Sequence, residues 1–296
     1  MDKKLMLLIN PQAGRGDYKN GLGEALEVFC RGGFIPAVYF TTGPGSALSL
    51  TKKHASDFDA LVCMGGDGTL SEVISGLMGV KKPPPLGYIP AGTANDLAAT
   101  FKLSRNPAEA AERIVSGNET AFDVGAFGKK EYFSYIAAFG AFTDVSYETP
   151  REQKRIFGHL AYIFEAMSRL TKLESRSARV EHDAGVTEGD FIFGGVTNST
   201  SLAGIVRLKD EAVDLSDGFF ELLLVRNPKN LANMNHILSA ILSRDYENYE
   251  EAVIIKSRRA RFIFDRPTAW TRDGESGGTH SSLKIRNRRA AVRLLL

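Results

Sequence analysis

Roughly the first 120 residues alternate between short apolar runs and amphipathic segments, and this alternation is the strongest constraint on the fold. The apolar runs, which are typical of buried strands, are Leu5–Ile9, Ala37–Thr41, Asp59–Met64 and Leu86–Ile89. The segments with helical spacing are Asn20–Arg31, Ser46–His54 with Ser46 as its expected cap, Thr69–Met78, and Pro107 to about Gly117. Strands and helices that alternate through short loops predict βαβ units, and therefore an α/β domain with a parallel sheet.

After about Asp123 the pattern changes to short β-branched or aromatic runs separated by Gly, Asn and Asp. These runs are Phe191–Val196, Phe219–Val225, Arg261–Phe264 and Leu283–Ile285. They predict a second, mainly antiparallel domain, a β-sandwich or barrel, interrupted by one amphipathic helix near Gln153–Leu170. We therefore expect two domains, 1–122 and 123–296, with the extreme C-terminus able to return to the first.

Composition excludes several classes of protein. The 296 residues carry 37 Lys and Arg against 35 Asp and Glu, a net charge of +2, which argues against a general nucleic-acid binder. Only two cysteines occur, Cys30 and Cys63, so no disulfide framework is expected and a cytoplasmic location fits best. Because no stretch approaches about 18 apolar residues, any membrane contact is expected to be peripheral.

Three glycine-containing loops follow predicted strands, at the edge where parallel sheets bind ligands. They are Asn10–Gly16, Gly65–Thr69 and Pro90–Asp96. Glycines let successive backbone N–H groups point into one concavity, and a helix start at Thr69 adds partial positive charge. The combination predicts a polyphosphate site, although none of the loops has the P-loop or the dinucleotide-binding pattern.

Asp67 is unexpected in a loop that binds phosphate, because a carboxylate repels that anion. Either Mg²⁺ bridges the two groups, or the carboxylate fixes the loop by hydrogen bonds. This residue is therefore a candidate catalytic residue. Thr93 and Asn95 are candidates to cap a helix and to bind a phosphate or ribose.

Together these loops resemble the diacylglycerol kinase catalytic-domain family, and most closely the soluble bacterial lipid kinases. The matching motifs are Asn-Pro-x-x-Gly at Asn10–Gly14, Gly-Gly-Asp-Gly-Thr at Gly65–Thr69, Gly-Thr-Ala-Asn-Asp at Gly92–Asp96, Val145–Pro150, Thr197–Ser199, Asp217-Gly218 and Asp273–Glu275. The resemblance covers nearly the whole chain. It implies a two-domain fold shared with NAD kinase, with ATP bound between the domains.

The resemblance also implies the roles of individual residues. The implied ATP site comprises Asn10, Pro11, Gln12, Ala13, Gly14, Thr41, Gly65, Gly66, Asp67, Gly68, Thr69, Leu70, Ser71 and Thr93. Glu275 would be the general base. A Mg²⁺ ion would be held by Asp217 and by the carbonyls of Asp214 and Phe219. Two residues depart from the family pattern, since Ala13 replaces the usual Ser and Ser71 replaces the usual Asn.

Two of these assignments depend on the resemblance alone. From the residues themselves, a solvated acid beside an Asp-Gly turn is the better explanation of Glu275, and only the family match reverses it. Asp217-Gly218 is likewise a common hairpin signal. Both alternatives stay open at this point.

The charge is unevenly distributed. Residues 256–296 hold eleven Lys and Arg and three acids, a net +8, which leaves −6 on residues 1–255. Such a basic region can dock on an anionic bilayer, or it can be the solvated face of antiparallel strands.

The sequence therefore predicts an ATP-dependent lipid kinase that phosphorylates a lipid hydroxyl, most simply that of diacylglycerol. It is expected to be cytoplasmic, peripherally associated with membranes, without a nucleic-acid partner, and able to form a homodimer. The alternatives are NAD kinase, another lipid acceptor such as phosphatidylglycerol or a sphingoid base, and a non-catalytic regulator that binds nucleotide or lipid.

Overall fold

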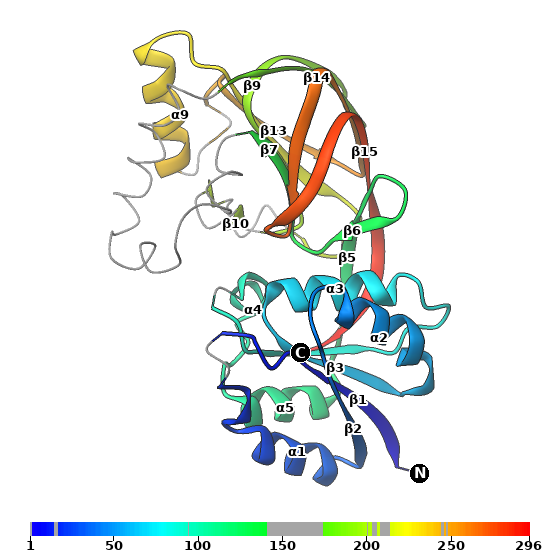
Figure 1. Cartoon of the computed structure of the whole chain (residues 1–296). Helices are drawn as coiled ribbons and strands as arrows, with labels where there is room; N and C mark the ends of the chain where they lie inside the picture. The colour runs from blue at the N-terminus through cyan, green and yellow to red at the C-terminus, as the bar shows by residue number, and fades with distance from the viewer. Residues whose placement is uncertain are drawn as a thin grey trace.

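The computed structural model of the chain describes residues 2–14, 17–93, 95–140, 174–199, 201–202, 206–207, 214–243, 246 and 248–296. These residues form two lobes, one above the other in Figure 1, which are joined by two strands. The predicted helix near Gln153–Leu170 and the motif Val145–Pro150 lie outside the described residues. No helix in the described part of the chain is long and apolar enough to cross a membrane.

The first lobe is built on four parallel strands in the order β4-β3-β1-β2. Their bounds are β1 Lys3–Ile9, β2 Phe34–Phe40, β3 Ala60–Gly65 and β4 Leu86–Pro90. Every residue of β3 and β4 is buried, as is expected where helices cover both faces of a parallel sheet. The continuous apolar runs in the sequence reflect this two-sided burial.

Helices cover both faces of this sheet. They are α1 Leu22–Arg31, α2 Ser46–His54, α3 Asp67–Leu77, α4 Asp96–Thr100 and α5 Pro107–Ser116, with short 3-10 helices η1 Asp17–Lys19 and η2 Ala55–Asp57. Met6 and Leu8 pack with α2 and α3, whereas Leu5, Leu7 and Ile9 pack with α1 and α5. The alternation along β1 therefore assigns one pair of helices to each face.

The predicted helix limits are close, with one correction. Helix α5 begins at Pro107 and is ended by Gly117 with φ 74°, as predicted, and the structure adds a cap from the Asn106 side chain. Ser46, however, is the first residue of α2 and not its cap. The Glu72 carboxylate on α3 accepts hydrogen bonds from the N–H groups of Gly45 and Ala47 at 2.7 and 3.0 Å, so the cap comes from another helix.

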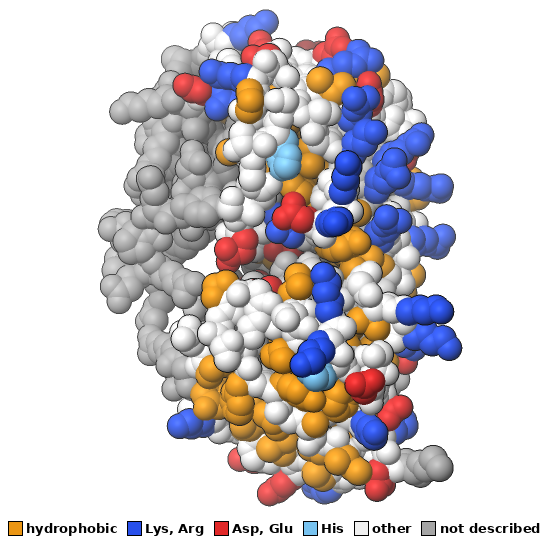
Figure 2. All heavy atoms as spheres, turned by 45° about the vertical axis from the view of Figure 1, so that its right-hand side comes forward, with side chains coloured by type: hydrophobic (Ala, Val, Ile, Leu, Met, Phe, Trp, Pro, Cys, Tyr) orange, Lys and Arg blue, Asp and Glu red, His pale blue; other side chains and the backbone are white. Residues whose placement is uncertain are grey.

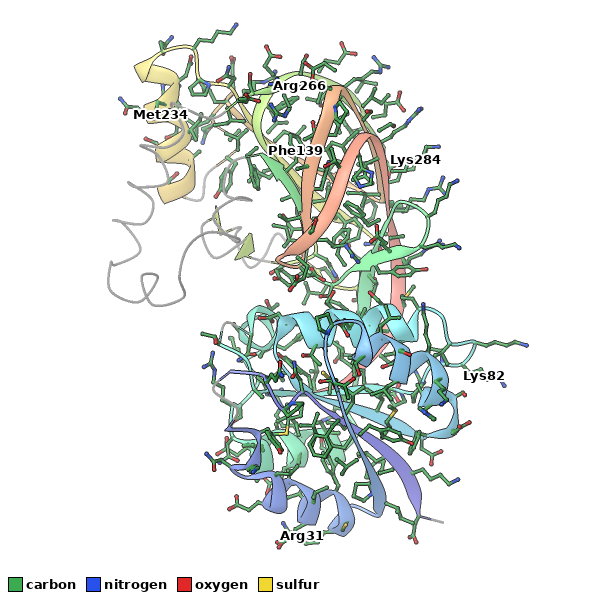
Figure 3. The ribbon with its side chains drawn as sticks, viewed as in Figure 1. Arg31, Lys82, Phe139, Met234, Arg266 and Lys284 are labelled. Carbon is green, nitrogen blue, oxygen red and sulfur yellow. The ribbon has the colours of Figure 1, made fainter. Side chains whose placement is uncertain are left out.

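The second lobe consists mostly of antiparallel strands. Their bounds are β6 Glu131–Phe133, β7 Ile136–Gly140, β8 Arg176–His182, β9 Gly185–Thr197, β10 Ser201–Leu202, β11 Val206–Arg207, β12 Phe220–Arg226, β13 Ala252–Ser257 and β14 Arg259–Arg272. Helix α9, Leu231–Ser243, packs on one side. Strands β9 and β14 each pair with β8 along one half and with β7 along the other. They therefore fold around an aromatic core in which Phe139 lies inside the lobe (Figure 3) beside Phe262 and Trp270. The predicted β-rich second part is confirmed.

Two strands connect the lobes, β5 Glu119–Phe127 and β15 Glu275–Leu295. Strand β15 pairs with β14 in the upper lobe, then with β5, and its last residues lie parallel to β4 in the lower lobe. The expected boundary between residues 122 and 123 falls inside β5. The division into 1–122 and 123–296 stays a prediction, while Leu294 and Leu295 lie in the first sheet.

Candidate functional site

The three glycine-containing loops lie side by side at the carboxyl ends of β1, β3 and β4. The Asn10 side-chain amide donates to Thr69 Oγ1 at 2.8 Å, and Ala91 N–H donates to the Gly65 carbonyl at 2.8 Å. A Cβ atom on Gly92 would lie 2.6 Å from the Gly66 Cα atom, so these two backbones are in contact. Because a side chain could not fit there, these glycines are required for the close approach of the loops.

The remaining predicted residues of the first loop are also at this edge. Thr41, which follows β2, donates its N–H to the Ile9 carbonyl at 2.9 Å, and this places it beside Asn10. The Asn10 side chain also accepts from Gln12 N–H at 2.9 Å, which holds the turn containing Pro11 and closes it toward Ala13 and Gly14. Leu70 is different, because its side chain is buried in the core and only its backbone lies at the site.

Asp67 joins the second loop to the third. Its carboxylate accepts a hydrogen bond from Asn95 N–H at 2.8 Å. Asn95 is buried with φ 55°, and its side chain bonds to both the N–H and the carbonyl of Gly92. Of the two roles considered for Asp67, the structure shows the loop-fixing hydrogen bond. Asn95 shapes the loop beside Thr93, and its side-chain amide is engaged within that loop.

Helix α3 begins at Asp67, directly after the second loop, so its first turn faces the three loops. The first N–H groups of a helix have no partner within the helix, and they carry partial positive charge. Gly66 is the capping residue, and as a glycine it brings no side chain to this end. The arrangement offers backbone donors to an anion at the edge of the sheet.

Glu275 comes to this helix from the other lobe. It follows the two-residue turn between β14 and β15, in which Asp273 and Gly274 have φ of 48° and 83°. Two left-handed residues are what a tight hairpin of this kind requires. A Cβ atom built on Gly68 would lie 3.6 Å from Glu275 Oε1, so the carboxylate faces the first turn of α3. The exposed acid therefore lies near the first turn of α3, whose N–H groups face the three loops.

The turn that carries Glu275 is fixed by Asp273, whose carboxylate is buried. It accepts five hydrogen bonds, from Ser134 N–H and Oγ at 2.6 and 2.8 Å, Tyr135 N–H at 3.0 Å, Ile136 N–H at 3.1 Å and Ser71 Oγ at 2.9 Å. Ser71 lies on α3, so this last bond crosses between the lobes. The sequence motif contained Asp273, but nothing in the local pattern indicated its donors, which lie 137 to 202 residues away.

The predicted metal ligands lie in a second acidic group, in the upper lobe. Asp217 accepts from Phe219 N–H at 2.8 Å and forms an ion pair with Lys256 at 2.7 Å, which raises the pKa of the lysine. Asp214 accepts from Ser216 N–H at 2.9 Å, and the Phe219 carbonyl accepts from the Asn287 amide at 3.0 Å. The described residues contain no group of three His, Cys, Asp or Glu side chains arranged to hold a metal ion.

The chemistry of this group nevertheless suits a hard cation. All its donors are oxygens, which Mg²⁺ prefers. Glu221 lies close enough to feel the charges of Lys256 and Asp217; it is buried, and its Oε2 has no hydrogen-bond partner among the described residues. Burial raises the pKa of Glu221 to about 8, although Lys256 acts in the opposite direction. The unpaired oxygen and the surplus of acids fit a cation held by Asp217 and the two carbonyls.

Asp123 is a third buried carboxylate, which sequence analysis did not select. It accepts from Gly218 N–H at 2.7 Å, Ala290 N–H at 2.7 Å and the Asn287 amide at 3.0 Å. These bonds connect β5 and β15 to the Asp214–Phe219 segment. They hold the predicted metal ligands against the two strands that join the lobes.

Comparison with known proteins gives a consistent result. The model of the family described as "Diacylglycerol kinase catalytic domain" matches residues 4–127. The chain is 32% identical over 281 residues to a diacylglycerol kinase of Staphylococcus aureus (94% of this chain and 88% of the relative). It is 30% identical over 278 residues to one of Bacillus subtilis (93% and 91%). A crystal structure of a diacylglycerol kinase from Bacillus anthracis str. Sterne shares the fold, with a TM-score of 0.80 at 23% identity over 99% of this chain and 96% of that one.

Proposed function

Because this chain belongs to the bacterial diacylglycerol kinase family and is a lipid kinase, we propose that its acceptor is diacylglycerol and its product phosphatidic acid. The γ-phosphoryl group comes from ATP. The relatives at 30% and 32% identity carry the name diacylglycerol kinase, which supports this acceptor over phosphatidylglycerol or a sphingoid base.

One observation carries the proposal: the Glu275 carboxylate of the upper lobe faces Gly68, in the first turn of α3 of the lower lobe. The phosphates of ATP bind at the glycine loops and at this helix end, where backbone N–H groups face an anion. A lipid hydroxyl that enters between Glu275 and the γ-phosphate is then within reach of both the base and the electrophile.

The chemical step follows from that placement. Glu275 accepts the proton of the lipid hydroxyl while the hydroxyl oxygen forms a bond to the γ-phosphorus atom. The bond between that phosphorus and the oxygen bridging to the β-phosphate breaks, and ADP leaves. Asp273 holds the turn that presents Glu275, and Ser71 ties that turn to α3. A primary hydroxyl is a weak nucleophile, so a positioned base is the contribution that this chain must make.

A divalent cation supplies charge neutralisation for the phosphates when it is bound. We assign Mg²⁺ to this role together with ATP, and Asp67, which lies within the second loop, could contact such an ion. A separate structural Mg²⁺ would be held by Asp217 and the carbonyls of Asp214 and Phe219. The unpaired Oε2 atom of buried Glu221 supports a cation in that neighbourhood.

Since the acceptor is a membrane lipid, the proposal includes peripheral association with an anionic bilayer. The basic region 256–296 supports this, since most of it forms the strands β14 and β15 (Figure 1), whose Lys and Arg side chains are nearly all exposed. A cytoplasmic location and a homodimer stay predictions from the sequence.

The test is a transfer assay with labelled ATP across a panel of acceptors in mixed micelles. The panel contains diacylglycerol, phosphatidylglycerol, a sphingoid base and, in solution, NAD. The proposal predicts labelled phosphatidic acid as the main product. Faster labelling of any other acceptor would reassign the substrate, and labelling of NAD would favour the NAD kinase alternative.

A further inference from the structure

The outer face of β8, β14 and β15 carries a cluster of cations that the proposed chemistry does not use. Arg259 and Arg261 on β14 lie directly opposite Arg286 and Lys284 on β15. Along β15 the exposed Lys284, Arg286 and Arg288 alternate with the buried Leu283 and Ile285 and the half-buried Asn287, so the three cations point the same way. We call Arg259, Arg261, Lys284, Arg286 and Arg288 the basic face.

The basic face places like charges opposite each other in two successive cross-strand pairs. Such pairs destabilise a sheet unless an anion neutralises them. The two arginines of β14 are neutralised by acids of β8 and the turn after it. Asp183 forms an ion pair with Arg259 at 2.9 Å, and Glu181 forms one with Arg261 at 3.7 Å. Within the described part of the chain, Lys284 and Arg286 have no ion pair. The β15 side of each pair therefore holds uncompensated charge.

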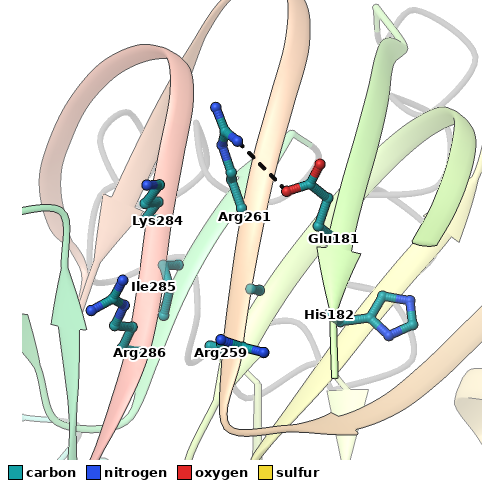
Figure 4. A pocket seen from close by; sticks show the side chains of 8 residues that line it. Glu181, His182, Arg259, Arg261, Lys284, Ile285 and Arg286 are labelled. Atoms are coloured by element: carbon teal, nitrogen blue, oxygen red, sulfur yellow. Dashed lines mark ion pairs between the residues drawn. The ribbon is translucent and has the colours of Figure 1, made fainter. Parts of the chain in front are cut away.

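A cavity of about 350 Å³ lies over these pairs, lined by the four paired cations together with Glu181, His182, Ala260 and Ile285. Figure 4 shows the cationic side chains gathered on the β14–β15 side, with the Glu181–Arg261 ion pair at one edge and the His182 ring pointing away. Burial lowers the pKa of His182, so its ring adds no positive charge at neutral pH. The cavity is large enough for a phosphate group, and its charge comes from side chains that stay ionised.

Next to it along β15, a second cavity of about 480 Å³ combines apolar and cationic walls. Leu77, Met78, Val80, Pro83 and Ala291 form the apolar side, and Arg288 and Arg289 with Asn287 form the polar side. Lys284 points outward from β15 in Figure 3, and Figure 2 shows Lys and Arg side chains in a band on this face, past the junction of the lobes. Cations beside an apolar wall suit an amphiphile better than a free ion.

We propose that the basic face binds the phosphate groups of anionic phospholipid headgroups, separately from the site that phosphorylates diacylglycerol. This inference rests on the proposed lipid-kinase function for the choice of a lipid over a soluble anion. It assigns membrane recruitment to the β14–β15 hairpin, and within it to the cations that lack an acidic partner.

The test measures binding of the full chain, without ATP, to vesicles of equimolar phosphatidylcholine and phosphatidylserine, and to vesicles of phosphatidylcholine alone. The double variant Lys284→Gln with Arg286→Gln should bind the anionic vesicles about 30-fold more weakly. The matched control is Arg179→Gln with Arg266→Gln, which removes the same charge from the same lobe. These two arginines already contact Glu188 and Glu174, so the control should stay within about 3-fold of the wild type.

Equal losses in the two double variants would show that only net charge matters and would overturn the site. Binding of inorganic phosphate at Lys284 and Arg286 without any preference for anionic vesicles would reassign the cavity to a soluble anion.

Because removal of like charges relieves repulsion, the Lys284/Arg286 variant should melt no lower than the wild type. In neutral detergent micelles it should also phosphorylate diacylglycerol at the wild-type rate. A wild type that binds vesicles but transfers no phosphate would refute the proposed function alone.

Discussion

Two buried acids in the upper lobe, Asp273 and Glu221, differ in what surrounds them. The Asp273 carboxylate accepts five hydrogen bonds, three of them from backbone N–H groups. Glu221 has one buried oxygen with no partner, and burial raises its pKa to about 8. The hydrogen bonds of the Asp273 carboxylate are all supplied by the folded chain, whereas the Glu221 carboxylate can still bind a proton or a cation.

This difference indicates that Asp273 positions other residues, whereas the group around Glu221 can bind a ligand. A fully bonded carboxylate cannot offer an oxygen to a ligand, but it fixes the segments that donate to it. Asp273 therefore acts through Glu275, which it holds against α3. The group around Glu221 retains unused oxygen, and for that reason we assign the structural cation there and not to the turn.

The largest effect on this comparison is expected from Asp273→Asn. The amide removes the charge and puts a donor where up to three donors converge, so folding should lose about 2–4 kcal/mol. The melting temperature should fall by roughly 5–10 °C in a thermal unfolding experiment.

The matched control is Asp265→Asn on the same strand, where the acid is exposed and should change stability by less than about 0.5 kcal/mol. If both variants melted alike, the network around Asp273 would not stabilise the lobe, and the two buried acids would not differ as described.

The second prediction concerns pH and Glu221→Gln, measured by urea unfolding in EDTA. The folded state holds a proton on Glu221 up to about pH 8, well above the ordinary glutamate pKa of 4.5. Folding therefore takes up a proton between these values, and this group makes stability fall as pH rises, by about 1.4 kcal/mol per unit. The variant cannot ionise and should lack that contribution.

Comparison of the two proteins at about pH 5.5 and 7.5 isolates the contribution of Glu221, because every other group is shared. An identical pH slope in both would mean that Glu221 ionises normally when the chain is folded. In that case the two buried acids would be equally well satisfied, and the argument for a cation in this group would fail.

The smallest effect is expected from Ser71→Ala. This change removes the one donor to Asp273 that comes from the lower lobe and leaves four others in place, so stability should fall by about 1 kcal/mol. Ser75→Ala, one turn later on α3, is the control and should be close to neutral. Equal losses would assign the effect to the helix and not to the bond between the lobes.

Much of the first lobe could be predicted from the sequence because its signals are local. The buried strands are continuous apolar runs, and Asn106, Pro107 and Gly117 mark the ends of α5. The glycine loops were found for the same reason, since each follows a strand directly. Even Ala13 and Ser71 could be recognised as departures from a family pattern, although Ser71 turned out to serve Asp273.

Contacts between distant segments could not be predicted in this way. Glu72 caps a helix that begins 26 residues earlier, and Asp273 binds donors more than 130 residues away. Strand β15 runs for 21 residues through both lobes, yet only Leu283–Ile285 is predicted as a strand, because small and polar residues precede this run and exposed cations follow it. The approach of Glu275 to Gly68 likewise exists only once the lobes are assembled.

The central claim is that Glu275 takes the proton of a lipid hydroxyl at the junction of the lobes. Transfer from labelled ATP to diacylglycerol by Glu275→Gln, measured beside its affinity for ATP, tests this most directly. We expect turnover to fall by roughly 10²–10⁴-fold while ATP binding is unchanged, because the amide keeps the shape but accepts no proton. Turnover close to that of the wild type would contradict the claim.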